Sequence, residues 1–224
     1  MADTAPTLSQ LRALLLSSPQ DVADDGLAAL FGGGGGPTDL GVPQQRDELR
    51  LWLNKWVCRL RYPRPGEPDV FSDSLAAWWA ASGSALPGGQ VADLSDTALG
   101  MIADSYADLA ARPGALLVRN GSIAGRRSIA PTAASKILFV LRPETVPPWD
   151  AAIARTSAGG TSRDHFAGYL NATRAWARAV QDQARQQGVT DIPAYVGRPG
   201  TSLAKLRDDW LYLTITRGCA IPPP

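Results

Sequence analysis

Residues 130–155 constrain the fold of this chain most strongly, because they predict two helices joined by a rigid turn. Residues 132–141 contain neither glycine nor proline. Four of their apolar residues fall on one face at helical spacing, namely Ala133, Ile137, Val140 and Leu141. Thr132 is the expected N-cap of this helix. Pro143 ends it, because the residue before a proline is disfavoured in the α region.

The turn that follows contains two prolines and leads into a second helix. Pro147 and Pro148 predict an extended segment that sets the positions of Trp149 and Asp150. Because Ala-Ala-Ile-Ala comes next, Asp150 is expected to cap the second helix, with its carboxylate accepting hydrogen bonds from backbone N–H groups. The sequence therefore predicts a helix–turn–helix unit whose turn presents a carboxylate.

Apolar residues recur at helical spacing along most of the chain, which predicts an all-α fold. We expect a compact multi-helix globular domain of about eight helices. Residues 115–123 form either a β-hairpin around Asn120-Gly121 or a loop, and residues 191–200 form a loop. The other predicted helices are 8–16 after Thr7, 22–31, 44–60, 72–79 capped by Ser72 or Asp73, 95–112 capped by Ser95, 162–187 capped by Thr161 or Ser162, and 202–216.

Composition shifts divide the chain into three regions. Residues 1–43 are predicted to be an acidic, partly flexible N-terminal region. Their five-glycine run, 32–36, is interpreted as a linker because no G-K-[ST] motif follows it. Residues 44–218 are predicted to form the helical domain, and residues 219–224 a proline-rich tail.

Several classes of protein are disfavoured by composition. With two cysteines and one histidine, neither a disulfide framework nor a Cys/His zinc site is expected, and we predict no metal and no cofactor. His165 is expected to lie at the surface or to cap a helix. No apolar run approaches the length that spans a membrane, and no signal sequence opens the chain, so we expect a cytoplasmic protein without a membrane partner.

Basic residues concentrate just before the Asp150 turn, although the formal net charge of the chain is only +1. Residues 112–142 contain no acidic residue. Their six basic residues are Arg112, Arg119, Arg126, Arg127, Lys136 and Arg142. A locally basic segment of this kind makes DNA a possible partner.

A helix, a short proline turn and a P-x-D sequence that opens another helix resemble the core of the helix-hairpin-helix DNA glycosylase superfamily. The matching residues are Pro148-Trp149-Asp150, preceded by Thr132-Ala133-Ala134 and 138–143, and the resemblance covers roughly a quarter of the chain. It implies a DNA-glycosylase-like fold for 44–218. It also implies that Asp150 is a catalytic carboxylate, which stabilises positive charge on the sugar as the base–sugar bond breaks and orients a water molecule.

The chain departs from the family pattern at two places. Where the family has a glycine-rich hairpin, this chain has residues 125–131, which contain one glycine. No lysine stands at the position of the family's Schiff-base nucleophile, which matches Ala130; Lys136 lies further along the helix. The resemblance therefore implies a monofunctional enzyme that uses water as its nucleophile.

Each candidate site residue also has a purely structural interpretation. Asp150 as an N-cap, at about 1 kcal/mol, explains the residue type without catalysis. Lys136, the second candidate catalytic residue, is alternatively a surface lysine, and Trp149, a candidate stacking surface for a flipped base, is alternatively a core residue. The remaining candidate substrate-binding residues are Arg126 and Arg127 in a turn before a helix, Arg198 before the last helix, and Lys205 on that helix.

Three functions remain open from the sequence. The first is a DNA glycosylase-like enzyme, the second a non-catalytic module that binds nucleic acid or protein, and the third a small-molecule enzyme on the same fold. The missing glycine hairpin favours the second and third.

Overall fold

The computed structural model of the chain describes residues 4–18, 38–120 and 122–223. In these residues the protein is all-α apart from one β-hairpin, which confirms the predicted fold class. The predicted helix 22–31 and the glycine run 32–36 lie outside the described residues. No helix in the described ranges is both long enough and apolar enough to cross a membrane.

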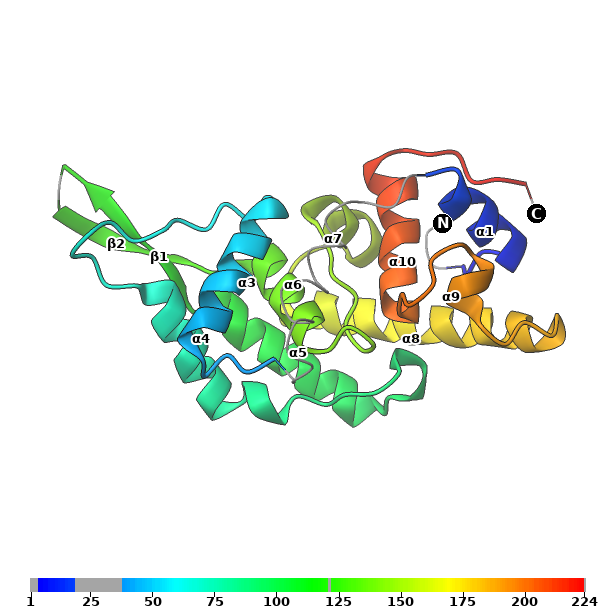
Figure 1. The fold of residues 1–224 in the computed structure, drawn as a ribbon, viewed down its shortest axis with the longest axis horizontal. Helices are drawn as coiled ribbons and strands as arrows, with labels where there is room; N and C mark the ends of the chain where they lie inside the picture. Colours follow the sequence, from blue (N-terminus) through cyan, green and yellow to red (C-terminus); the bar gives the residue numbers. More distant parts are fainter. Residues whose placement is uncertain (1–3, 19–37, 121, 224) are drawn as a thin grey trace.

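The helices pack side by side, and the hairpin extends from one end of them (Figure 1). The elements are α1 (Leu8–Leu16), α3 (Pro43–Lys55), α4 (Val70–Ala81), α5 (Asp96–Ala111), β1 (Pro113–Arg119), β2 (Ser122–Ser128), α6 (Pro131–Leu141), α7 (Ala151–Ala158), α8 (Arg163–Gln186), α9 (Ile192–Tyr195) and α10 (Leu203–Leu211), with a π-helical turn at Tyr212–Thr216 and short 3₁₀ turns at Gly83–Ala85 and Val91–Asp93.

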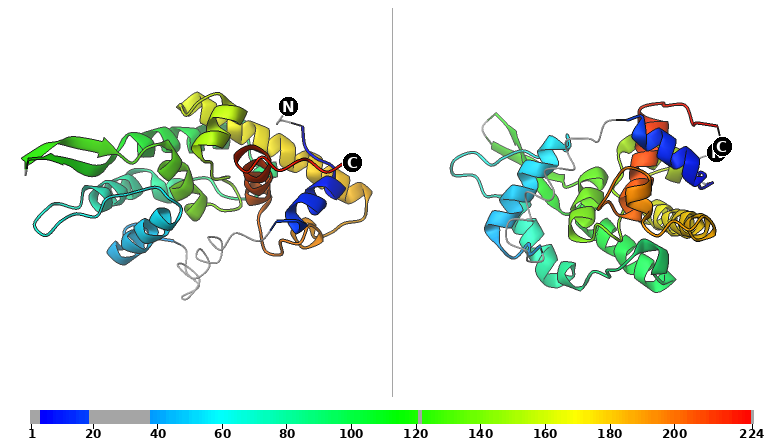
Figure 2. Two further views of the ribbon diagram at one scale, coloured as in Figure 1. Left: turned by 90° about the horizontal axis from the view of Figure 1, so that it is seen from above. Right: turned by 45° about the vertical axis from the view of Figure 1, so that its right-hand side comes forward.

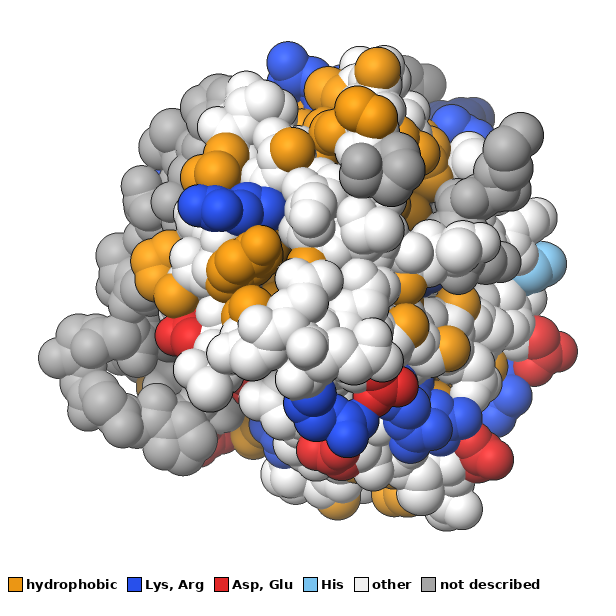
Figure 3. Space-filling model, turned by 90° about the vertical axis from the view of Figure 1, so that its right-hand side faces the viewer, with side chains coloured by type: hydrophobic (Ala, Val, Ile, Leu, Met, Phe, Trp, Pro, Cys, Tyr) orange, Lys and Arg blue, Asp and Glu red, His pale blue; other side chains and the backbone are white. Residues whose placement is uncertain are grey.

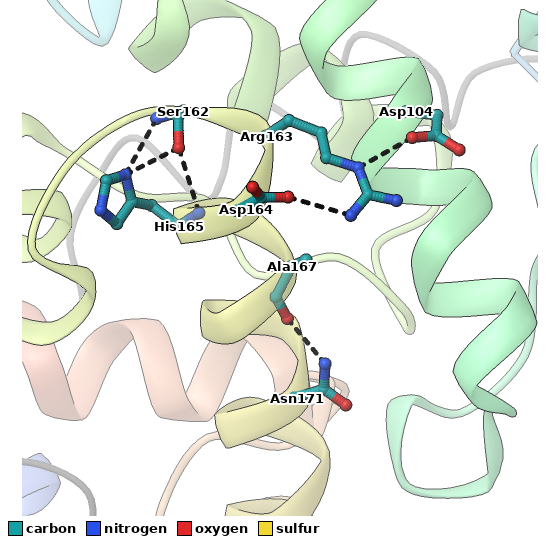
Figure 4. A network of polar contacts seen from close by, with 7 residues as sticks. All are labelled: Asp104, Ser162, Arg163, Asp164, His165, Ala167 and Asn171. Carbon is teal, nitrogen blue, oxygen red and sulfur yellow. Dashed lines mark hydrogen bonds and ion pairs between the residues drawn. The ribbon is translucent and has the colours of Figure 1, made fainter.

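The longest helix, α8, packs against α1, α5, α7 and α10, and its apolar face lies in the common core. Its start is fixed by a capping network (Figure 4). Ser162 Oγ accepts the backbone N–H of His165 at 3.3 Å and contacts the Nδ1 atom of the same residue at 2.8 Å. Arg163 pairs with Asp104 of α5. The structure thus confirms Ser162 as the N-cap and His165 as a capping residue.

Several predicted boundaries shift. Helix α3 ends at Lys55 instead of residue 60, because Val57 and Arg59 have positive φ angles, which no helix accommodates. Helix α4 starts at Val70 and is capped by Asp69, so the predicted caps, Ser72 and Asp73, are wrong. Helix α10 ends at Leu211 and continues as the π-helical turn, and the predicted loop 191–200 contains the short α9.

Helix α6 begins earlier than predicted. Pro131 occupies its first turn, where a missing backbone N–H is harmless, so the predicted cap at Thr132 is wrong. Ala130 precedes it with φ 75° and ψ 157°, a backbone conformation that normally requires glycine. All residues from Ala133 to Leu141 are buried, and α6 is therefore the central helix of the fold.

Of the two alternatives for residues 115–123, the β-hairpin is observed. Strands β1 and β2 are antiparallel, and Leu116 pairs with Arg126 and Ala115 with Arg127. Residues 125–128, expected in a turn equivalent to the family hairpin, lie instead inside β2. That expectation was wrong because β2 continues the pairing with β1 as far as Ser128.

The two ends of the described chain lie next to each other (Figures 1 and 2). Gln10 of α1 donates a hydrogen bond from its side chain to the Pro222 carbonyl at 2.9 Å. Gln183 of α8 accepts from the Leu8 backbone N–H at 3.0 Å. Helix α1, which falls in the predicted N-terminal region, therefore contributes its leucines to the same core as the helical domain.

Candidate active site

Asp150 caps α7, as predicted, and its two carboxylate oxygens have different surroundings. Oδ1 accepts the backbone N–H groups of Ala152 and Ile153, both at 2.7 Å. Oδ2 accepts the hydroxyl of Thr216, from the π-helical turn, at 2.8 Å. The side chain is half-buried. The positive end of the α7 dipole stabilises the negative charge of this carboxylate.

The backbone of the turn that carries Asp150 is held against α6. Ser135, which is buried in α6, accepts the Trp149 backbone N–H at 3.3 Å, and its hydroxyl lies 3.4 Å from the Trp149 carbonyl oxygen. Pro147 and Pro148 are buried as well. The position of Asp150 is therefore fixed from both sides, by the rigid turn before it and by the helix after it.

Trp149 is a core residue. Its side chain is 1% exposed, and its ring lies 4.9 Å from that of Phe166, 5.2 Å from that of Tyr169 and 5.7 Å from that of Tyr106. A ring enclosed by three others has no free face on which a base could stack. The structure thus supports the core alternative, and Trp149 is not a stacking surface in this conformation.

The buried Tyr169 hydroxyl connects the Asp150 turn to α8. It donates to the Pro148 carbonyl at 3.2 Å. Burial raises the pKa of Tyr169 well above its usual range; the charge of Arg207 lowers it, and those of Asp208 and Asp150 add to the rise. The phenol is therefore neutral at neutral pH and acts as a hydrogen-bond donor that holds the turn.

Lys136 joins α6 to the segment after α3. Its side chain is 8% exposed, so the surface alternative is wrong. Nζ donates to the Trp56 carbonyl at 2.8 Å and lies 4.9 Å from the centre of the Trp56 ring. The nearby Cys58 thiol has a raised pKa because it is buried, although the charge of Lys136 opposes that rise.

Lys205 approaches the same tryptophan from α10. Its side chain is buried, and Nζ lies 5.8 Å from the centre of the Trp56 ring. It pairs with Asp208 at 3.1 Å and with Asp209. One cluster of side chains is therefore formed by Trp56, Lys136, Lys205, Asp208 and Asp209.

Arg207 is a buried residue that the sequence analysis did not single out. It is 1% exposed, donates to the Thr173 hydroxyl at 2.7 Å and lies 4.7 Å from the centre of the Tyr169 ring. The signal was present in the sequence: Arg207 lies four residues after Leu203 and three before Trp210, on the buried face of α10. A charged residue on such a face requires specific partners.

Arg198 does not form an anion site. Its guanidinium donates to the carbonyls of Leu15 at 2.8 Å and Ser18 at 2.9 Å, where α1 ends. Unpaired carbonyls at a helix C-terminus attract a cation. Ser202 caps α10 and donates to the Pro143 carbonyl at 2.6 Å. The segment predicted to bind a phosphate therefore fastens α1 and α10 to the body.

The structure brings some predicted site residues together and separates others. Lys136 and Lys205 meet at Trp56, and the charges of Lys205 and Asp150 both act on the Tyr169 hydroxyl. Arg126 and Arg127 are exposed on β2, in the hairpin at one end of the molecule, whereas α7 lies near the middle (Figure 1).

Within residues 4–18, 38–120 and 122–223, no group of three or more His, Cys, Asp or Glu side chains is arranged to hold a metal ion. Comparisons with protein-family models, with curated proteins and with solved structures gave no significant match.

Proposed function

We propose that this protein is DNA-glycosylase-like and hydrolyses the base–sugar bond of a damaged or modified nucleotide, with Asp150 as its catalytic carboxylate. The observation that carries the proposal is the arrangement of that carboxylate. Oδ1 is occupied by two backbone N–H groups, whereas Oδ2 has one donor, the Thr216 hydroxyl. A carboxylate oxygen accepts about two hydrogen bonds, so Oδ2 retains capacity for a water molecule.

The proposed reaction uses this asymmetry. As the base leaves with the electron pair of the base–sugar bond, positive charge develops on the sugar, and the fixed negative charge of Asp150 stabilises it. Water bound at Oδ2 attacks the anomeric carbon and transfers its proton to the carboxylate. Lys136 has a positioning role in this proposal, because its Nζ donates to the Trp56 carbonyl at 2.8 Å. The enzyme is accordingly monofunctional.

A non-catalytic binding module of the same fold is the second candidate. The observation that favours it is the state of the other predicted site residues. Arg198 is engaged by main-chain carbonyls, Lys205 by two aspartates, and Trp149 by core aromatic rings. Because these residues are held by other groups of the protein, in this function they serve the structure and not a reaction. Asp150 is then only a helix cap.

Base release from duplexes that carry damaged or modified bases separates these candidates. We expect wild-type protein to release a base and Asp150→Asn to be at least about 100-fold slower, because asparagine keeps an oxygen for the cap but loses the charge. Asp191→Asn is the matched control, since Asp191 caps α9 through the Ala194 N–H. This control should retain full activity.

The other outcomes are equally informative. Equal release by wild-type and Asp150→Asn protein would remove Asp150 from the reaction. No release by either, together with equal and salt-dependent DNA binding, would support the binding module. If the protein neither releases a base nor binds DNA, both functions that involve DNA are contradicted.

A further inference from the structure

The β1–β2 hairpin is a two-stranded ribbon (residues 113–128) that extends beyond the helices (Figures 1 and 2). Only its root is packed against the body. Leu116 is buried there, and Gly114 lies so close to Ile129 that an added Cβ would sit 2.9 Å from its backbone. The ribbon therefore has a firmly held base and an outer part exposed to solvent.

The exposed surface of the ribbon is positively charged: Arg119 lies near its tip, and Arg126 and Arg127 lie nearer its base, opposite Leu116 and Ala115. Arg119, Arg126 and Arg127 are exposed, and residues 113–128 contain no aspartate or glutamate. None of the three takes part in an ion pair within the described portion of the chain. At the opposite end of the molecule, basic and acidic side chains are mixed (Figure 3). Among the described residues, the positive charge of the ribbon therefore has no acidic side chain as an ion-pair partner.

The arginines lie on both faces of the ribbon. Arg126 pairs with Leu116 and Arg127 with Ala115, and consecutive residues of a strand point to opposite faces. A groove of duplex DNA has phosphates along both walls, and it admits a two-stranded ribbon. A flat anionic surface, by contrast, meets only one face at a time.

Two apolar side chains accompany the charge. Leu117 is 47% exposed and Ile123 is 61% exposed. Apolar side chains that proteins carry into a DNA groove contact sugars and base steps. Exposed apolar groups between cations therefore match the interior of a groove, where the phosphates lie outside and the bases inside.

The ribbon is rigidly connected to the candidate active site. Ile129 and Ala130, which follow β2, donate backbone hydrogen bonds to the carbonyls of Arg112 at 2.8 Å and Ala110 at 3.2 Å. Helix α6 starts directly afterwards and holds the Asp150 turn through Ser135. A duplex seated on the ribbon would thus have a fixed position relative to Asp150.

We propose that the ribbon enters a groove of duplex DNA, with Arg126 and Arg127 at the phosphates of its two walls and with Leu117 and Ile123 against the sugars and bases. The choice of DNA over another polyanion rests on the proposed function. The ribbon itself is tested by binding alone, so that base release is not required for the test.

The decisive comparison uses two double variants with the same loss of charge. Arg126→Gln/Arg127→Gln changes the ribbon. Arg12→Gln/Arg185→Gln changes α1 and the last turn of α8, at the opposite end of the molecule (Figure 1). The dissociation constant for a fluorescent duplex is measured at several salt concentrations, for both variants and for wild-type protein.

We expect the ribbon variant to lower the slope of log K against log salt by about two, and to bind about 50-fold more weakly at 0.1 M salt, because each lost phosphate contact removes about 0.9 from the slope. The control variant should keep the wild-type slope. Ile123→Ser should weaken binding several-fold at an unchanged slope, because the lost contact is apolar.

Equal slopes for the ribbon and control variants would overturn the proposal. The proposal would also be overturned if wild-type protein bound vesicles of anionic phospholipid but not the duplex, and if the ribbon variant bound the vesicles more weakly. This result would assign the ribbon to a membrane surface. If the ribbon variant binds the duplex more weakly than wild-type protein but wild-type protein releases no base, the proposed role of the ribbon is supported and the proposed glycosylase activity is contradicted.

Discussion

At the scale of single residues, the turn that carries Asp150 is held by buried polar groups, each of which contacts the next. Tyr169 holds the Pro148 carbonyl, and Arg207 lies over the Tyr169 ring while it donates to Thr173. Burying a charge or a hydroxyl is unfavourable unless partners replace water. We therefore expect these residues to matter for stability as well as for the site.

Arg207→Ala should lower the free energy of unfolding by about 3 kcal/mol, because a buried network loses its charged donor. Urea unfolding measures this change. Arg155→Ala, at an exposed position in α7, serves as the control and should stay within about 0.5 kcal/mol of wild type. A similar small effect for Arg207→Ala would mean that the network adds nothing to stability.

Stability should fall at high pH because burial raises the pKa of both Tyr106 and Tyr169. Above about pH 10 the unfolded chain loses these protons while the folded chain keeps them, so the free energy of unfolding decreases by about 1.4 kcal/mol per pH unit for each tyrosine. Urea unfolding between pH 9 and 11 measures the slope. Tyr169→Phe should remove half of the slope that the two tyrosines contribute. A slope equal to that of wild-type protein would contradict this prediction.

At the scale of elements, α6 is the helix on which the site is built. It is buried from Ala133 to Leu141, it follows the ribbon directly in the chain, and it holds the Asp150 turn through Ser135. Its first residue follows Ala130, whose φ of 75° is unfavourable for any side chain with a Cβ. The junction between ribbon and helix is therefore a point of local strain.

Ala130→Gly should raise the free energy of unfolding by about 1 kcal/mol, since glycine adopts this conformation without strain. Thermal and urea unfolding both report the change. Ala133→Gly, inside α6, is the comparison variant and should destabilise by about 1 kcal/mol. If Ala130→Gly destabilised the protein to the same extent, Ala130 would not be strained in solution.

At the scale of the whole molecule, the two ends of the chain close the fold around α8 and α10. Helix α1 packs on both, and Arg198 holds its C-terminal carbonyls. The chain thus places its candidate active site in the middle of the molecule and its ribbon at one end (Figure 1). The function that we propose requires a duplex to contact both.

Arg198→Ala tests the structural interpretation of this residue. It should lower the free energy of unfolding by about 2 kcal/mol, because two main-chain carbonyls lose a charged donor. Hydrogen exchange should be faster in α1. Duplex binding of the folded variant should be unchanged. If the salt dependence of duplex binding were reduced in this variant, Arg198 would contact a phosphate after all.

Helical spacing, caps and turns depend on neighbouring residues, so the helical fold and the capping of α7 by Asp150 could be predicted from the sequence alone. The same reasoning narrowed the cap of α8 to Thr161 or Ser162, and residues 115–123 to a hairpin or a loop. The tertiary structure decided which charged residues are buried and where they point. Lys136, Arg198 and Lys205 found partners up to 183 residues away, which spacing along the chain does not reveal. It also decided that Trp149 belongs to the core and that Arg126 and Arg127 lie on a ribbon, because burial and strand pairing are properties of the packed molecule.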